Sequence, residues 1–287
     1  MPSMARRFSG KLNQLDHTLP EGLLVDSAWM GEHGYSRSLR NQYVHSGWLE
    51  QPTRGVYRRP RGALSWQQVV VSLQTILDAD PLVVGGRTAL ELQGYAHYLS
   101  QNVSEIHLYG PRPPPRWLSK LPIDVRFIAH NSRALFKSGF VADGGDRHRH
   151  WNFATGAVLP GVNSNDSVTV LPWGQWDWPL TLSTPERAIL ELLNELPKRE
   201  SFHQVDKLFE GLGNLSPRRL TALLADCRSV KVKRLFFFFA ARHPQAWLKR
   251  LDRSRIDLGS GKRMLVKGGR LDPETQITVP EDLDADR

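Results

Sequence analysis

The sequence predicts an α+β protein built from a small N-terminal domain and a larger mixed domain. Three observations lead to this expectation. Residues 23–60 contain two short helical segments around a glycine and then a basic hairpin pattern, residues 103–171 alternate as strands do, and residues 184–270 have helical periodicity and a basic composition. This order predicts a winged helix-turn-helix over residues 1–62 and a mixed α/β C-terminal domain over residues 63–287.

The N-terminal pattern consists of two helix signals separated by a turn signal. Ser27 is expected to cap a first helix that ends near His33, because a serine hydroxyl accepts a hydrogen bond from an unpaired backbone N–H. Gly34 permits a tight turn, since glycine adopts positive φ without steric cost. A second helix is expected from Ser36 to the residue before Gly47, where glycine commonly ends a helix.

The second helix and the hairpin after it carry the residue types that contact DNA. Leu39 and Tyr43 fall on one side of the helix, and the opposite side has no carboxylate. The turn Pro52–Gly55 lies between two short alternating segments and would form the wing. A solvated helical hairpin without a DNA partner is the alternative. Arg, Asn and Gln recognise base edges and hairpin arginines meet phosphates; we therefore predict base contacts from Arg37, Ser38, Asn41 and Gln42 and phosphate contacts from Arg40, Arg54, Arg58 and Arg59.

The remaining elements follow from periodicity, caps and helix breakers. The tryptophan-rich stretch 172–180 is expected to cover the domain junction or to stack on bases. The loop 111–118, PRPPPRWL, is either a stiff surface loop or a polyproline ligand, and the acidic tail 281–287 is expected to be loose. Helices are expected at 5–16, 65–79, 86–92, 184–196, 202–210, 217–228 and 230–242, and strands at 103–109, 123–130, 150–159, 167–171, 263–267 and 276–280.

The charge of +9 is distributed unevenly along the chain. Residues 1–62 carry +4, residues 63–200 carry −1 and residues 201–287 carry +6. Residues 218–270 alone hold 15 Lys and Arg against 3 Asp and Glu, which indicates a second surface that attracts polyanions. A basic helical face without a dedicated ligand is the alternative. The expected members of this surface are Lys231, Lys233, Arg234, Lys262, Arg263, Lys267 and Arg270.

The composition favours a protein of the reducing cytoplasm. The single cysteine, Cys227, leaves no intramolecular disulfide framework and is expected to be a buried apolar side chain. The basic first residues lack the apolar stretch of a signal peptide. The longest strongly apolar run, residues 235–241, is too short to cross a bilayer, so no membrane partner is expected.

The sequence contains little that indicates catalysis. His148 and His150 have the spacing of some metal ligands, but the surrounding run is rich in arginine and has no convincing third ligand. Glu105 and Asp124 lie on neighbouring strand candidates without the lysine pattern of a nuclease. Glu186 is expected to pair with the last helices. We therefore expect no enzyme activity, no cofactor and no metal.

Several segments together resemble the AbiEi family of antitoxins and transcriptional regulators from type IV toxin–antitoxin systems. The similarity extends over nearly the whole chain and depends on the order and spacing of the motifs. These are GWLEQPTRGVYRRP at 47–60, GGRTALELQGY at 85–95, LSTPERAILELLNELP at 182–197, and the tail motifs SPRRLTALLADCRSVKVKRLFFFFA, GKRMLVKGGRLD and ITVP.

The resemblance implies functions that composition and spacing do not. A single winged domain reads only a short site, so operator DNA with inverted or tandem repeats is expected. The resemblance implies an N-terminal domain that represses its own operon. It also implies a C-terminal region that neutralises a nucleotidyltransferase toxin, without requiring a stable complex. Two other classes stay open: a plain winged-helix regulator with an effector-binding C-terminal domain, and a DNA-targeted nuclease. The candidate antitoxin surface comprises Lys231, Lys233, Arg234, Arg263 and Lys267.

Overall fold

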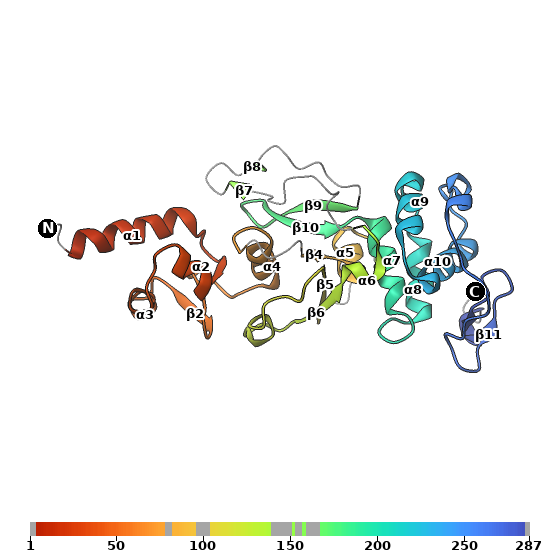
Figure 1. Cartoon of the computed structure of the whole chain (residues 1–287), viewed down its shortest axis with the longest axis horizontal. Helices are drawn as coiled ribbons and strands as arrows, with labels where there is room; N and C mark the ends of the chain where they lie inside the picture. Colours follow the sequence, from red (N-terminus) through yellow and green to blue (C-terminus); the bar gives the residue numbers. More distant parts are fainter. Residues whose placement is uncertain are drawn as a thin grey trace.

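The chain forms an elongated mixed α/β structure with its N-terminal helices at one end and a helical layer at the other (Figure 1). The computed structural model describes residues 4–77, 82–95, 104–138, 151–152, 157–158 and 167–284. None of the described helices combines the length and the apolar character that a membrane crossing requires.

The N-terminal part contains three helices and a small antiparallel sheet. The middle strand of this sheet pairs with both of its neighbours, in the order β1-β3-β2. The apolar sides of the three helices pack on the sheet around buried Leu19, Met30 and Tyr43. The elements are α1 (Met4–Thr18), β1 (Leu24–Asp26), α2 (Ser27–Glu32), α3 (Arg37–His45), β2 (Glu50–Thr53) and β3 (Val56–Arg58).

The starts of α2 and α3 show one difference from the expected caps. Asp26 caps α2, because its Oδ1 accepts a hydrogen bond from the backbone N of Trp29 at 2.9 Å. The expected cap, Ser27, instead donates its backbone N–H and its hydroxyl to the carbonyl oxygen of Gly55, at 2.8 and 3.1 Å. Ser36 caps α3 as expected. Ser27 therefore joins α2 to the turn between β2 and β3.

A single helix connects the N-terminal part to the rest of the protein. This helix is α4 (Trp66–Gln74), and Ser65 and Gln68 form a capping box at its start. Its Ser72 hydroxyl accepts a hydrogen bond from the backbone N of Leu24 in β1 at 2.8 Å. At its other end, the side chain of Gln74 bonds both backbone groups of Thr181. The hydrophobic core is therefore continuous across the boundary expected at residue 62.

The described residues of the central region form a five-stranded mixed sheet in the order β6-β5-β4-β10-β9. β5 and β6 run parallel, as do β4 and β10, and the other neighbours are antiparallel. β7 and β8 pair with each other in a separate two-stranded antiparallel sheet. The elements are β4 (Val83–Val84), α5 (Gly86–Leu92), β5 (Glu105–Gly110), η1 (Leu118–Lys120), β6 (Arg126–Asn131), α6 (Ser132–Leu135), β7 (Trp151–Asn152), β8 (Ala157–Val158), β9 (Val168–Trp173), β10 (Trp178–Ser183) and α7 (Pro185–Glu195).

The tryptophan-rich stretch contains a strand that the sequence analysis did not predict. β10 lies in the sheet between β4 and β9, and all its residues are buried. Trp176, in the turn before this strand, stacks on Arg61 from the segment after β3, with 3.5 Å between the guanidinium carbon and the ring centre. This stretch therefore does cover the junction between the N-terminal part and the sheet.

The C-terminal region is a helical layer followed by an irregular ribbon. Its helices agree with the expected ones to within two residues, and the phenylalanine run of α10 lies in the core. The strand expected at 263–267 is wrong, because only Arg263 of that segment forms an isolated bridge, to Ile277, and the strand that pairs with β12 is Arg270–Leu271. The tail is partly docked, since Leu283 is buried. The elements are α8 (Phe202–Glu210), α9 (Pro217–Asp226), α10 (Val230–Arg242), η2 (Leu248–Arg250), η3 (Arg253–Arg255), β11 (Arg270–Leu271), β12 (Thr278–Val279) and η4 (Glu281–Asp284).

Candidate nucleic-acid interface

One face of α3 is an exposed polar surface. The buried side of the helix is held by Tyr43, and the partly buried Leu39 packs beside it on the N-terminal core. No Asp or Glu occurs between Arg37 and His45. The side chains that could reach a base edge are therefore polar or basic, and they are free of local carboxylates. The exposed residues on this face are Arg37, Ser38, Asn41, Gln42 and His45.

Arg40 lies between this face and the hairpin. Its Nη1 donates a hydrogen bond to the carbonyl oxygen of Ser27 at 3.1 Å. Its guanidinium carbon is 5.6 Å from the centre of the Tyr57 ring. The side chain is half-buried, so it can meet a phosphate only at the edge of α3. Its main structural effect is to hold α3 against β3.

The three hairpin arginines have different environments. Arg54 is exposed in the turn between β2 and β3, as expected of a phosphate contact. Arg58 is 5% exposed; its Nε donates to Glu50 Oε2 at 2.5 Å and its Nη2 to the carbonyl of Gly62 at 2.6 Å. Because a buried, paired guanidinium cannot reach DNA, the predicted phosphate contact at Arg58 is wrong.

Arg59 also makes contacts within the protein. It forms ion pairs with Asp16 at 2.5 Å and Glu21 at 3.2 Å. Its Nη1 additionally donates to the backbone carbonyl of Leu19 at 3.1 Å, at the end of α1. A phosphate contact at Arg59 would therefore compete with these two ion pairs, and it stays a prediction. Arg58 and Arg59 fix the base of the hairpin, and Arg54 alone of the three extends from its tip.

The second predicted surface is partly buried. Lys233 and Arg234 are buried, with 6% and 3% of their surface exposed. Arg234 donates to the carbonyls of Leu258 at 2.8 Å and Gly261 at 2.6 Å. The Nζ of Lys231 donates to the carbonyl of Leu196 at 2.8 Å, at the end of α7. The prediction of an exposed polyanion surface is therefore wrong at these three positions, because the ribbon occupies the donors of Arg234, the end of α7 occupies that of Lys231, and Lys233 is buried.

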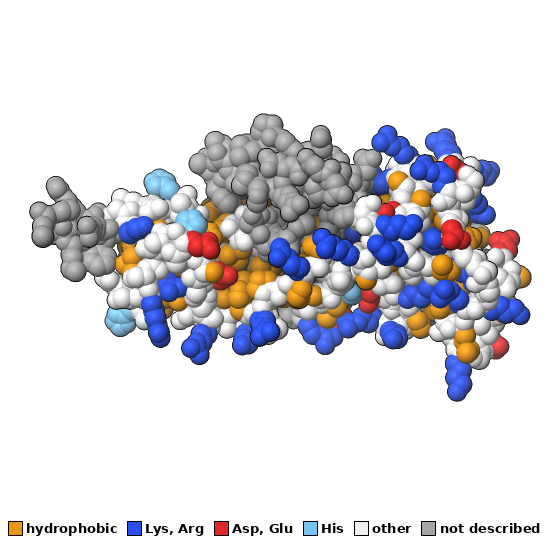
Figure 2. Space-filling model, in the orientation of Figure 1, with side chains coloured by type: hydrophobic (Ala, Val, Ile, Leu, Met, Phe, Trp, Pro, Cys, Tyr) orange, Lys and Arg blue, Asp and Glu red, His pale blue; other side chains and the backbone are white. Residues whose placement is uncertain are grey.

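The rest of that predicted surface does face solvent. The four basic residues of the ribbon are exposed, as is the side chain of Met264 in the same segment. Figure 2 shows Lys and Arg side chains gathered on this end of the molecule. Of the basic residues predicted for this surface, the exposed ones therefore lie in the ribbon and not on α10. These exposed residues are Lys262, Arg263, Lys267 and Arg270.

A polar cluster lies between the parallel strands and α7. The Nδ1 of His107 and the Nε2 of His130 are 2.9 Å apart, and His130 Nδ1 is 3.4 Å from Glu195 Oε1. Burial is the largest cause that lowers the pKa of His130 to about 4, and the charges of His107 and Arg199 lower it further. Burial also raises the pKa of Glu195. Burial lowers the pKa of His107 as well, so both histidines are neutral at pH 7 and the cluster is a hydrogen-bonded part of the sheet.

The residues considered for catalysis have structural partners. Glu105 pairs with Arg126, which lowers the pKa of the carboxyl. Glu186 accepts from Arg219 Nη1 at 2.8 Å, so its expected pairing with a later helix is confirmed. His148 and His150 lie outside the described residues. Among the residues that the structure describes, no group of three or more His, Cys, Asp or Glu could hold a metal ion.

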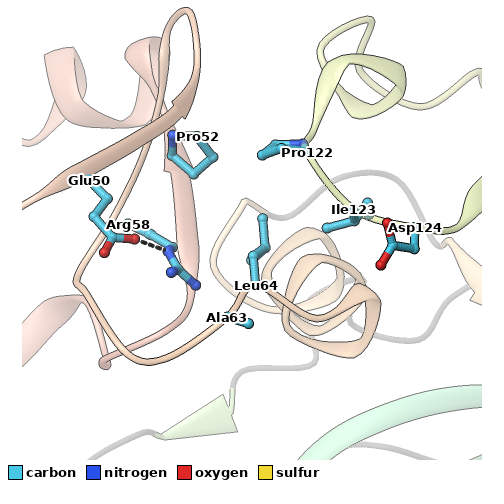
Figure 3. Close-up of a pocket in the computed structure, with 8 residues that line it drawn as sticks. All are labelled: Glu50, Pro52, Arg58, Ala63, Leu64, Pro122, Ile123 and Asp124. Carbon is cyan, nitrogen blue, oxygen red and sulfur yellow. Dashed lines mark hydrogen bonds and ion pairs between the residues drawn. The ribbon is translucent and has the colours of Figure 1, made fainter.

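A cleft of about 350 Å³ separates the hairpin from the central region (Figure 3). On one side lie Glu50 and Arg58, and Pro52 of β2 faces Pro122 across the gap. Asp124 is on the opposite wall. The cleft places the loop after η1 directly beside the hairpin. The other lining residues are Ala63, Leu64 and Ile123.

The comparisons with known proteins agree with this arrangement. No curated protein matches the chain. Among solved structures, the crystal structure of the RV2827C protein from Mycobacterium tuberculosis has the same fold, with a TM-score of 0.54 and 15% identity, and the match covers 95% of this chain and 89% of that one. Two family models match, one described as "Transcriptional regulator, AbiEi antitoxin N-terminal domain" over residues 9–101 and one as "Transcriptional regulator, AbiEi antitoxin, Type IV TA system" over residues 160–280. The chain belongs to the AbiEi antitoxin family of transcriptional regulators of type IV toxin–antitoxin systems.

Proposed function

We propose that the N-terminal part is a winged helix-turn-helix that binds operator DNA. In this assignment α3 enters the major groove and the β2–β3 turn follows the neighbouring backbone as the wing. The observation that supports it most is the exposed face of α3, which carries Arg37, Asn41 and Gln42 and no carboxylate. Arg54 supplies the wing charge. Bases are read by Arg37, Ser38, Asn41 and Gln42, while Arg40 and Arg54 meet phosphates.

The second part of the proposal concerns the operon. The chain represses its own promoter and neutralises a nucleotidyltransferase toxin encoded beside it. Membership of an antitoxin family supports the pairing with a toxin. One α3 reads only a short site, so the proposal includes inverted or tandem operator repeats and at least two bound copies.

Operator binding is tested with DNA from upstream of the gene that encodes this chain. The full chain should protect repeated sites from cleavage, and a scrambled duplex of equal length should bind far more weakly. Asn41→Ala should cost about 1–3 kcal/mol on the operator and relax specificity at one base pair. Asn214→Ala is a matched control, because Asn214 is an exposed amide between α8 and α9, outside the N-terminal part. Equal binding of operator and scrambled duplex by the wild-type chain would refute the proposal.

Toxin neutralisation is tested by co-expression. The neighbouring gene should slow growth when expressed alone, and co-expression of the full chain should restore it. An Asn41→Ala chain should still restore growth under an external promoter, since neutralisation is assigned to the C-terminal region. Failure of the wild-type chain to restore growth would leave a DNA-binding regulator without antitoxin activity.

A further inference from the structure

We infer that the proline-rich loop between β5 and β6 is a second DNA-backbone contact, which extends the interface beyond the wing. This inference rests on the proposed operator binding. The loop and η1 cover residues 111–120, and the loop after η1 reaches the cleft at Pro122. Because Pro122 faces Pro52 of β2, this part of the central region is the wing's immediate neighbour (Figure 3).

The position of the loop matches the side on which DNA would lie. In Figure 1, α3, the β2–β3 hairpin and the loop between β5 and β6 reach the same lower side of the molecule. Figure 2 shows Lys and Arg side chains along that lower edge, from the N-terminal part to the central region. A duplex held by α3 and the wing would therefore continue over this loop.

The charges of the loop suit a phosphate backbone. Between Gly110 and Ser138 the sequence has six Lys and Arg and one carboxylate, Asp124. Arg116 and Lys120 are exposed, and among the described residues no salt bridge or side-chain hydrogen bond involves their charged groups. Arg126, by contrast, is paired with Glu105. Within residues 111–120, Arg116 and Lys120 are thus exposed cations that the described part of the protein leaves available.

The backbone of the loop is rigid and anchored. Prolines at 111, 113, 114 and 115 fix φ and remove backbone donors, so little conformational entropy is lost on binding. The backbone N of Leu118 donates to the carbonyl of Pro115 at 3.0 Å, and Lys120 N donates to Trp117 O at 2.9 Å. Leu118 and Leu121 are buried and tie η1 to the core. The stiff surface loop PRPPPRWL and η1 therefore hold Arg116 and Lys120 at fixed positions.

The test compares the full chain with Arg116→Ala/Lys120→Ala on duplexes from its own promoter. Each lost phosphate contact lowers the salt dependence of log K by about 0.9, so the double variant should lose roughly two units of slope. The double variant should bind more weakly than wild type at low salt. A fourfold rise in salt should then reduce the ratio of its Kd to the wild-type Kd by about tenfold. Discrimination between operator and scrambled DNA should stay unchanged, because α3 is intact.

Two comparisons make the result specific. Lys249→Ala/Arg250→Ala removes the same charge from exposed positions on η2, and it should keep the wild-type slope. Removing roughly one helical turn, about 10 base pairs, from the wing side of the site should abolish the difference between wild type and Arg116→Ala/Lys120→Ala.

The outcomes separate the two proposals. A wild-type chain that binds its operator, together with a loop variant of unchanged slope and footprint, overturns the loop contact and leaves operator binding intact. An equal loss of slope in the η2 variant also overturns it, because net charge alone then explains the effect. A wild-type chain without operator preference overturns the proposed function and the loop contact with it.

Discussion

The guanidinium carbon of Arg61 lies 3.5 Å from the centre of the Trp176 ring, across the junction between the N-terminal part and the central sheet. Arg61 also lies 3.4 Å from Glu21 Oε2 on the N-terminal side. One side chain therefore contacts both regions, in addition to the shared helix α4. This contact helps to fix the orientation of the proposed DNA-binding surface relative to the sheet.

Removing this ring should weaken the fold modestly. Trp176→Ala is expected to lower the free energy of unfolding by about 1 kcal/mol, because cation–π contacts at partly exposed sites have this strength. Chemical denaturation measures the change, and a double-mutant cycle with Arg61→Ala isolates the pair. Trp48→Ala is the matched control, since Trp48 is an exposed tryptophan of comparable accessibility. A coupling energy near zero would show that the contact does not stabilise the protein.

Substitution of Arg54 should change DNA affinity, whereas substitution of Arg58 should change the stability of the protein. Arg54→Ala should leave the unfolding free energy unchanged and flatten the salt dependence of operator binding by about one unit. Arg58→Ala should lower the unfolding free energy by about 1–3 kcal/mol, because it removes charge-assisted hydrogen bonds to Glu50 and Gly62. Titration with promoter DNA and chemical denaturation check the two effects. A stable Arg58→Ala chain that has lost only DNA affinity would contradict this assignment.

The sequence predicted the elements better than it predicted the environments of their side chains. Helix starts at Ser36 and Pro185 carry local signals, since caps and N-terminal prolines act within one turn. The helix start at α2 was placed one residue late because Asp26 and Ser27 are both good caps, and the tertiary bond from Ser27 to Gly55 decides between them.

Burial of charged residues could not be predicted in the same way. Arg58, Arg59 and Arg234 have the same local sequence character as exposed arginines. Their partners lie at carbonyls and carboxylates distant in the chain or across a turn, such as Gly62, Asp16 and Leu258. β10 was missed for a related reason, because its tryptophan and proline belong to a stretch whose sequence resembles a surface turn, although the strand is buried in the sheet.

His130 should make the stability of the protein depend on pH. Its pKa is about 4 in the folded chain and about 6.5 in an unfolded one. Between these values the unfolded chain binds a proton that the folded chain does not, so the contribution of His130 is present above pH 6.5 and is lost as the pH falls towards 4. The raised pKa of the neighbouring Glu195 acts in the opposite direction, because its contribution falls as the pH rises.

The variant His130→Gln separates the contribution of His130 to the unfolding free energy from that of the neighbouring carboxyl groups. The difference in unfolding free energy between wild type and His130→Gln should shrink by on the order of 2 kcal/mol between pH 7 and pH 4. Chemical denaturation across this range measures it, and the carboxyl groups largely cancel in the comparison. A difference that does not change with pH would show that His130 titrates alike in both states.

Arg234 should be required for the C-terminal ribbon and not for direct toxin contact. Arg234→Met should lower the unfolding free energy by about 3 kcal/mol, because several carbonyls between Leu258 and Gln276 lose a charged donor. Limited proteolysis should then cleave the ribbon faster than in wild type. The paired test is Arg263→Glu/Lys267→Glu, whose exposed side chains can be reversed without disturbing the core. If the ribbon is the antitoxin surface, this variant should remain folded and fail to restore growth beside the toxin gene. Full rescue by the folded double variant would place the antitoxin activity elsewhere in the C-terminal region.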